Sequence, residues 1–132
     1  MPAMHSDPRR TRGEIGERIA ERHLERRGYR VITRNYRTRY GEIDLIAVDE
    51  GAIVFCEVKT RAGAERSGPA APFDAIGPLK RRRIRMMAAQ WLAAQAEEPS
   101  RPRRAELRFD AIGVTLGAGD RLVALDHLEG AF

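Results

Sequence analysis

Charged side chains interrupt two apolar runs of this chain in a pattern that suits phosphate chemistry. Asp44 lies in the first run, Gly41 to Val48, and Glu57 and Lys59 lie in the second, Ala52 to Arg61. Residues two apart on a strand point to the same face, so Glu57 and Lys59 are expected to share one. Carboxylates on an apolar sheet are costly to desolvate unless a partner compensates them. Divalent cations such as Mg²⁺ bind carboxylate, water and phosphate oxygens, so these residues predict a metal site for phosphodiester hydrolysis.

A plain ion pair between Glu57 and Lys59 on an exposed strand face is the simpler interpretation. Phe55 shares that face and Asp44 interrupts a separate apolar run, and both facts favour the metal site. In such a site Asp44 and Glu57 would be the metal ligands. Lys59 would orient the attacking water or stabilise the charge that develops on the phosphate.

Two further carboxylates have roles that the sequence leaves open. Glu17 lies at the edge of the apolar stripe of the first predicted helix, one turn before Ala20 and Leu24. It could reach the sheet as an additional ligand, although periodicity alone favours a solvent-exposed position. Glu42 follows Gly41 at the entrance to a strand, where a turn carboxylate and a contact at the edge of the site are equally favoured.

The hydrophobic pattern predicts helices and strands in the order αβββαββ. Gly28 ends the first helix in a position where glycine tolerates positive φ. The helices are predicted over Gly13 to Arg27 and Leu79 to Ala96, and the strands over Tyr29 to Tyr36, Ile43 to Val48, Ala52 to Thr60, Ala105 to Leu116 and Arg121 to Leu128. This order predicts an α/β fold, with a small mixed central sheet flanked by helices.

The composition predicts a single basic domain. The chain has 132 residues, 42% of them hydrophobic, and a net charge of +5. We interpret Met1 to Arg12 as a disordered basic arm and Gly13 to Phe132 as one domain with one core. A basic surface favours polyanions. The single cysteine, Cys56, fits a reducing cytoplasm, and no apolar run is long enough for a membrane span.

An uninterrupted basic run opens the second predicted helix, from Lys80 to Arg83. Such a run is usually a solvated face, but its single sign suits contact with the phosphates of a nucleic acid. We expect Lys80, Arg81 and Arg82 to bind nucleic acid, together with Arg61 at the end of the second apolar run. The histidines of the chain share no metal-ligand spacing and are given no role.

A series of short motifs follows along the chain: Gly13-x-x-Gly16-Glu17, Asn35-Tyr36-Arg37, Gly41-Glu42-Ile43-Asp44, Phe55-x-Glu57-Val58-Lys59, Lys80-Arg81 and Arg108-Phe109-Asp110. At Asp44 and Glu57-x-Lys59 the series resembles the PD-(D/E)xK, or restriction-endonuclease-like, superfamily. More closely, it resembles the YraN family of uncharacterised bacterial proteins, which are similar to archaeal Holliday-junction resolvases. The resemblance runs from Gly13 to Phe132.

The resemblance implies a restriction-endonuclease-like core whose catalytic set is Glu17, Asp44, Glu57 and Lys59. It makes Glu17 a metal ligand beside Asp44 and Glu57, and it implies one or two Mg²⁺ ions, with Mn²⁺ as a substitute. The implied function is a metal-dependent endonuclease acting on DNA, branched or repair intermediates included. The alternatives are a nucleic-acid-binding module of the same fold without hydrolysis, and an adaptor for an acidic protein. A homodimer, which paired cuts by a resolvase require, is left open.

Overall fold

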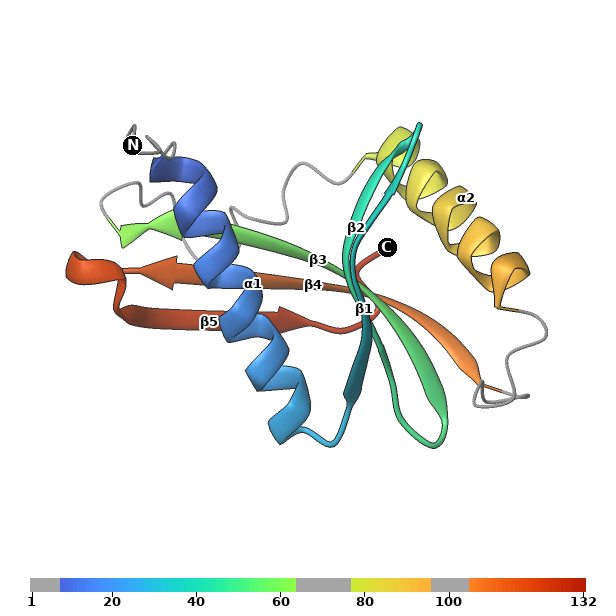
Figure 1. Cartoon of the computed structure of the whole chain (residues 1–132), viewed down its shortest axis with the longest axis horizontal. Coiled ribbons are helices and arrows are strands. Elements are labelled where there is room, and N and C mark those ends of the chain that lie inside the picture. Colours follow the sequence, from blue (N-terminus) through green and yellow to red (C-terminus); the bar gives the residue numbers. More distant parts are fainter. Residues whose placement is uncertain (1–7, 64–76, 96–104) are drawn as a thin grey trace, which may run out of the picture.

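A five-stranded mixed sheet with a helix on each face forms the framework of the molecule (Figure 1). The computed structural model describes residues 8–63, 77–95 and 105–132. The elements are α1 (Pro8–Arg26), β1 (Arg30–Thr38), β2 (Gly41–Val48), β3 (Ala52–Ala62), α2 (Pro78–Ala94), β4 (Glu106–Leu116), the short 3₁₀ helix η3 (Ala118–Asp120) and β5 (Leu122–Leu128). The predicted α/β class and the order αβββαββ are confirmed.

The first helix begins earlier than the hydrophobic pattern predicted. It starts at Pro8 rather than Gly13, so the stretch from Pro8 to Arg12 is helical instead of belonging to the basic arm. Proline suits the first turn of a helix, because its missing N–H would have no helical partner there. Residues 1–7 of the predicted arm lie outside the described residues.

The strands lie in the order β1-β2-β3-β4-β5, and only β3 and β4 run parallel. A parallel pair needs a long crossover, and the segment that contains α2 supplies it. The β3–β4 ladder is long and regular, from the pair Ala52–Glu106 to the pair Ala62–Leu116. It is therefore the longest uninterrupted pairing at the centre of the described sheet.

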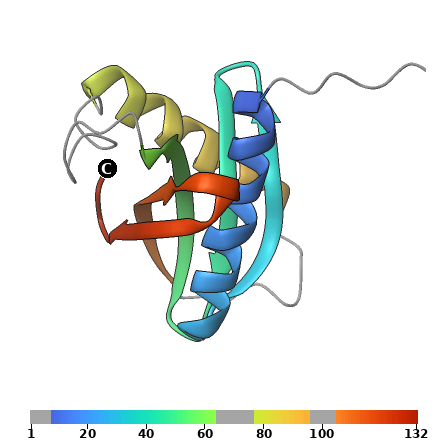
Figure 2. The same ribbon diagram turned by 90° about the vertical axis from the view of Figure 1, so that its left-hand side faces the viewer.

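The two helices cover opposite faces of this sheet (Figure 2). Ala20 and Leu24 of α1 pack on one face, and Met87 and Trp91 of α2 pack on the other. Cys56 is buried in the core on the α1 face, as its apolar neighbours predicted. Neither helix of the described residues is long and apolar enough to span a membrane.

Helix α1 approaches β3 very closely at Gly16. A Cβ atom built on Gly16 would lie 1.8 Å from Thr60 Oγ1 and 2.8 Å from Thr60 Cβ. Only a residue without a side chain fits at this crossing. The next residue of α1 is Glu17, so this crossing determines where the Glu17 side chain lies relative to the sheet.

A buried carboxylate, Asp110 of β4, ties α1 to the end of the chain. Its side chain is fully buried and accepts two hydrogen bonds from Arg108, at 2.9 Å each, and one from Gly130 N at 3.0 Å. His127 Nε2 lies 2.8 Å from Asp110 Oδ2, and His127 Nδ1 lies 2.9 Å from Nε2 of His23 on α1. Burial alone would raise the pKa of Asp110, but the bonds from His127, Arg108 and Gly130 outweigh it and lower the pKa.

We predict that Gly16→Ala destabilises the fold by about 1–3 kcal/mol, because the added methyl group forces α1 away from β3. Gly13→Ala is the matched control, since no atom lies within 4 Å of a Cβ built there. In the control, alanine's higher helix propensity should stabilise the protein by about 0.5–1 kcal/mol. Urea unfolding of both variants measures the difference, and a Gly16→Ala protein as stable as the wild type would contradict the packing described above.

We predict that Asp110→Asn destabilises the protein by about 1.5–3 kcal/mol at pH 7, because it removes the buried negative charge that Arg108 and His127 share and leaves Arg108 with only the weaker pair to Glu129 at 3.7 Å. A carboxylate with a lowered pKa stabilises the fold above its unfolded-state pKa, and this contribution is lost as the pH falls through the folded-state value. The difference from the wild type should therefore shrink below about pH 4. Urea titrations across pH test this, with Asp126→Asn on β5 as the control. A difference that does not depend on pH would contradict a charged Asp110.

Candidate metal centre

Strands β2 and β3 diverge at Asp44 and Glu57 (Figure 1). Their pairing runs only from Val48–Ile53 to Leu45–Cys56. Beyond that point, within the described residues, β2 continues along β1 and β3 continues along β4. The Asp44 side chain replaces the missing main-chain acceptor, because its Oδ2 accepts the N–H of Val58 at 2.7 Å. The Asp44 carboxylate therefore bridges β2 and β3 at the point where their main-chain pairing ends.

An irregularity in the β1–β2 ladder sets the direction of the acidic side chains. The residues on either side of Asn35 and Asp44 are paired, but these two are not, and Asn35 has a φ of 51°. Asparagine tolerates this left-handed conformation better than most residues. Side-chain alternation shifts here: Ile43 packs on the α2 face, whereas Leu45 packs on the α1 face. Glu42 and Asp44 consequently lie together beside α1.

Glu17, Glu42 and Asp44 converge at the mouth of the gap. One carboxylate oxygen from each lies within 4.8 Å of the other two. The Asn35 side-chain amide donates to Glu17 Oε1 at 3.1 Å and to Glu42 Oε1 at 2.6 Å, so it holds these two side chains side by side. Opposite ligands of one Mg²⁺ ion are about 4 Å apart. Three oxygen donors grouped in this way are the kind of ligands that a hard divalent cation takes.

The carboxylates of the cluster are only partly neutralised. Arg37 Nε lies 3.4 Å from Glu42 Oε2, and the charge of Arg37 opposes the rise in the pKa of Glu17. Burial raises the pKa of Asp44 to about 7; the Val58 N–H opposes this shift, and the charges of Glu17, Glu42 and Glu57 add to it. Burial also raises the pKa of Glu17 against the hydrogen bond from Asn35, and the charge of Glu42 adds to that shift. A bound cation would relieve the repulsion, and so would a proton.

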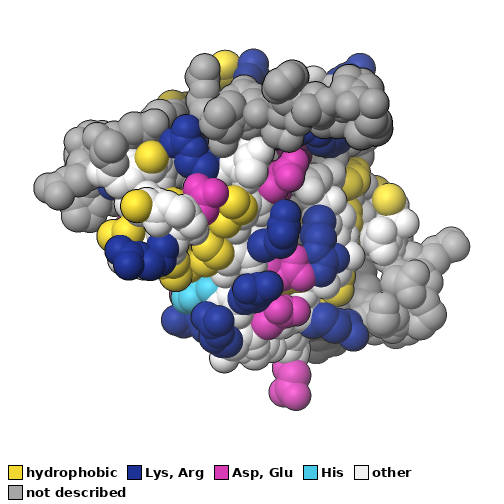
Figure 3. All heavy atoms as spheres, turned by 60° about the vertical axis from the view of Figure 1, so that its left-hand side comes forward, with side chains coloured by type: hydrophobic (Ala, Val, Ile, Leu, Met, Phe, Trp, Pro, Cys, Tyr) yellow, Lys and Arg dark blue, Asp and Glu magenta, His cyan; other side chains and the backbone are white. Residues whose placement is uncertain are grey.

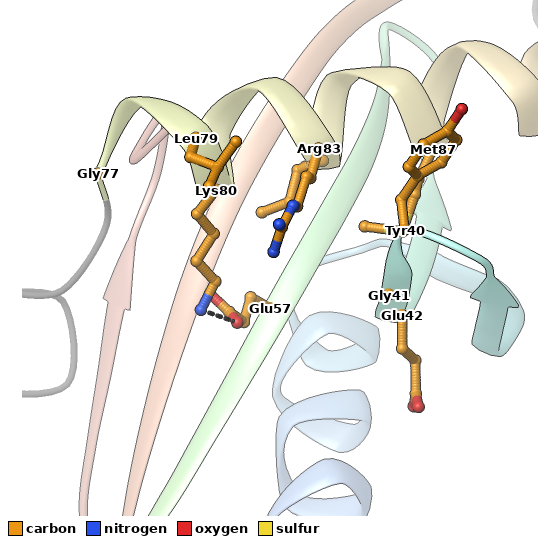
Figure 4. Close-up of a pocket in the computed structure, with 10 residues that line it drawn as sticks. Tyr40, Gly41, Glu42, Glu57, Gly77, Leu79, Lys80, Arg83 and Met87 are labelled. Atoms are coloured by element: carbon orange, nitrogen blue, oxygen red, sulfur yellow. Dashed lines mark ion pairs between the residues drawn. The ribbon is translucent and has the colours of Figure 1, made fainter.

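Glu57 lies next to the cluster but faces the other helix. Its Oε1 is 2.5 Å from Lys80 Nζ of α2 (Figure 4). The two side chains are 26% and 40% exposed, and ion pairs this exposed contribute about 1 kcal/mol or less. The pair is therefore easily exchanged for other partners. The charge of Glu57 still raises the pKa of Asp44, so the two carboxylates interact electrostatically.

The structure brings together only part of the predicted set. Glu17 and Asp44 meet as expected, and Glu42 joins them in place of Glu57. Lys59 is exposed on β3, two residues beyond Glu57, and makes no ion pair with the described residues. Asn35 was missed because its role depends on its backbone conformation. Its place in the Asn35-Tyr36-Arg37 motif was the only signal of importance in the sequence.

A cavity of about 520 Å³ lies between the start of α2 and the gap. Glu42 and Glu57 line it from the sheet, and Lys80 and Arg83 line it from the helix. The other two residues of the basic run that were expected to bind nucleic acid, Arg81 and Arg82, are exposed and do not line it; Arg61 is half-buried on β3.

On the face drawn in Figure 3, the described basic residues do not form an unbroken positive surface. The face drawn in Figure 3 carries acidic and basic side chains side by side. Two ion pairs of α1 show the same mixing: Arg10 with Glu14 at 3.5 Å, and Glu21 with Arg34 of β1. Mixed charge of this kind attracts a polyanion weakly. Lys80 and Arg83 differ from these pairs in their position, because both line the cavity beside the carboxylate cluster.

Comparison with known proteins identifies the family. The profile described as "Uncharacterised protein family UPF0102" matches residues 16–114. A UPF0102 protein of Mycolicibacterium smegmatis is 45% identical over 129 residues, covering 96% of this chain and 97% of the relative. A UPF0102 protein of Mycobacterium avium is 43% identical over 135 residues, covering 98% of both. The chain therefore belongs to the UPF0102, or YraN, family of uncharacterised proteins.

Proposed function

We propose that this protein is a metal-dependent endonuclease that hydrolyses phosphodiester bonds in DNA, including branched or repair intermediates. The observation that carries the proposal is the convergence of Glu17, Glu42 and Asp44 where β2 and β3 diverge. Clustered carboxylates of this kind suit a hard divalent cation. We propose Mg²⁺ as the natural cation and Mn²⁺ as a substitute, and we propose that the protein works in the cytoplasm, where Cys56 stays reduced.

The chain's own residues would divide the work as follows. Glu17, Glu42 and Asp44 would hold the cation, and Asn35 would keep the first two oriented through its hydrogen bonds. When bound, the cation supplies Lewis acidity and a more acidic water. Lys59 would donate to the phosphate or orient the attacking water.

A nucleic-acid-binding module without hydrolysis is the second candidate. The ion pair between Glu57 and Lys80 favours it, because it directs one of the expected ligands away from the cluster. The two candidates differ in whether bound DNA is cut. A homodimer, expected for paired cuts in opposite strands, stays a prediction.

We predict that Asp44→Asn weakens Mn²⁺ binding about tenfold or more, because it removes a charged ligand but keeps an oxygen for the Val58 N–H. A carboxyl group with a raised pKa destabilises the fold increasingly as the pH rises to the folded-state value, so the metal-free variant should be more stable than the wild type above pH 7. Calorimetric titration and urea unfolding measure the two effects.

Asp49→Asn is the matched control for the metal measurement. The Asp49 side chain accepts hydrogen bonds from Gly51 N and Ala52 N in the β2–β3 turn, outside the cluster. Its substitution should leave Mn²⁺ affinity unchanged. Equal Mn²⁺ affinities for the wild type and Asp44→Asn would rule out the proposed centre.

We predict that the protein cleaves at least one of branched, linear duplex and single-stranded DNA when Mg²⁺ or Mn²⁺ is present, and none when the cation is chelated. Lys59→Ala should cut about 10²–10⁴-fold more slowly while it still binds the DNA. Arg121→Ala, which removes an exposed charge before β5, is the control and should cut normally. DNA that is bound but cut under none of these conditions would favour the binding module.

A further inference from the structure

The cavity beside the acidic cluster has walls of opposite charge. In Figure 4, the side chains of Lys80 and Arg83 extend from α2 toward the sheet, where Glu57 approaches Lys80. Glu42 lines the same cavity and also belongs to the cluster with Glu17 and Asp44. The cavity and the cluster are therefore adjacent parts of one site, joined at Glu42.

The two cations of the cavity differ in their partners. Lys80 is paired with Glu57, whereas Arg83 is exposed and makes no ion pair with the described residues. An arginine in this setting offers a fork of donors that matches a phosphate group. Lysine binds phosphate as a compact point charge on a flexible chain, so Lys80 can change partners with little rearrangement.

We propose that this cavity binds a backbone phosphate of the substrate between Lys80 and Arg83, and that Lys80 leaves Glu57 for that phosphate. The released Glu57 carboxylate then becomes available to the cation beside Asp44. In the DNA-free protein, Lys80 balances the charge of Glu57 and competes with the cation for it. This inference rests on the proposed function, and it adds the phosphate site and the coupling of DNA binding to metal binding.

The exchange follows from the charges of Lys80, Glu57 and Asp44. Once Lys80 has left, the negative charge of Glu57 is no longer balanced, and it repels the nearby Asp44, whose Oδ2 accepts the N–H of Val58, the residue after Glu57. A divalent cation relieves that repulsion, so it binds more favourably after the phosphate has taken Lys80. Coupling between two ligands is reciprocal, so the cation must tighten DNA binding by the same factor.

Arg82 provides a matched control for Lys80. It carries the same charge on the same helix, two residues further along, but it does not line the cavity. Removal of either positive charge weakens the general attraction of the protein to DNA and slightly raises its affinity for cations. Only removal of Lys80 should alter the coupling.

The experiment compares the wild type with Lys80→Met and Arg82→Met. Calorimetry measures the affinity of each protein for Mn²⁺ in the absence of DNA. Fluorescence anisotropy measures the affinity of each protein for a short branched DNA oligonucleotide, once with Ca²⁺ present and once with a chelator. For the wild type we expect Ca²⁺ to tighten DNA binding about 5–50-fold. Lys80→Met should reduce this factor to below about twofold and should bind Mn²⁺ several-fold more tightly than Arg82→Met does.

The possible outcomes separate the two proposals. A Lys80→Met protein whose coupling factor and Mn²⁺ affinity match those of Arg82→Met would overturn the exchange and leave the metal centre standing. A wild-type protein that binds no cation would overturn the proposed function itself. Arg83→Met supports the phosphate site if it weakens DNA binding more than Arg82→Met does, and an equal or smaller effect counts against that site.

Discussion

The early end of the β2–β3 ladder is the constraint on which the candidate site depends. A ladder continued past Leu45 and Cys56 would fill the space between the strands with main-chain hydrogen bonds. Because it stops there, the Val58 N–H needs another acceptor, and the Asp44 carboxylate supplies it at 2.7 Å. The same side chain thus ends the pairing of the strands and belongs to the acidic cluster. Asp44 therefore has both a structural role and a proposed role in metal binding.

Carboxylates held this close repel one another, so the rest of the fold must keep them in place. The close crossing at Gly16 brings Glu17 to the gap, and the Asp110 network fixes the other end of α1 through His127 and His23. Burial raises the pKa of Asp44, and the charges of Glu17, Glu42 and Glu57 raise it further, so the ionised form of Asp44 is unfavourable in the metal-free protein. Favourable interactions elsewhere in a fold commonly hold an energetically unfavourable functional site in place in this way.

The helices, the strands and part of the candidate site could be predicted from the sequence. The parts of the site that could not be predicted were missed for physical reasons. Asp44 and Glu57 were identifiable because a charge inside an apolar strand is costly. Glu42 stayed ambiguous because the irregular backbone at Asn35 shifts the face on which it lies, and periodicity assumes a regular strand. His23 and His127 are 104 residues apart, so no local spacing could connect them. Helical phase places Lys80 and Arg83 on one face of α2 and separates them from Arg81 and Arg82, but only the packed helix shows that this face meets the cavity.

The proposed metal centre is tested most directly by the anomalous diffraction signal of Mn²⁺ in crystals of the DNA-free protein. If the metal centre exists, a peak is expected at coordination distance, about 2.0–2.6 Å, from carboxylate oxygens of Glu17, Glu42 and Asp44. A Mn²⁺ peak elsewhere on the protein, with no density between these three side chains at saturating metal, would contradict it.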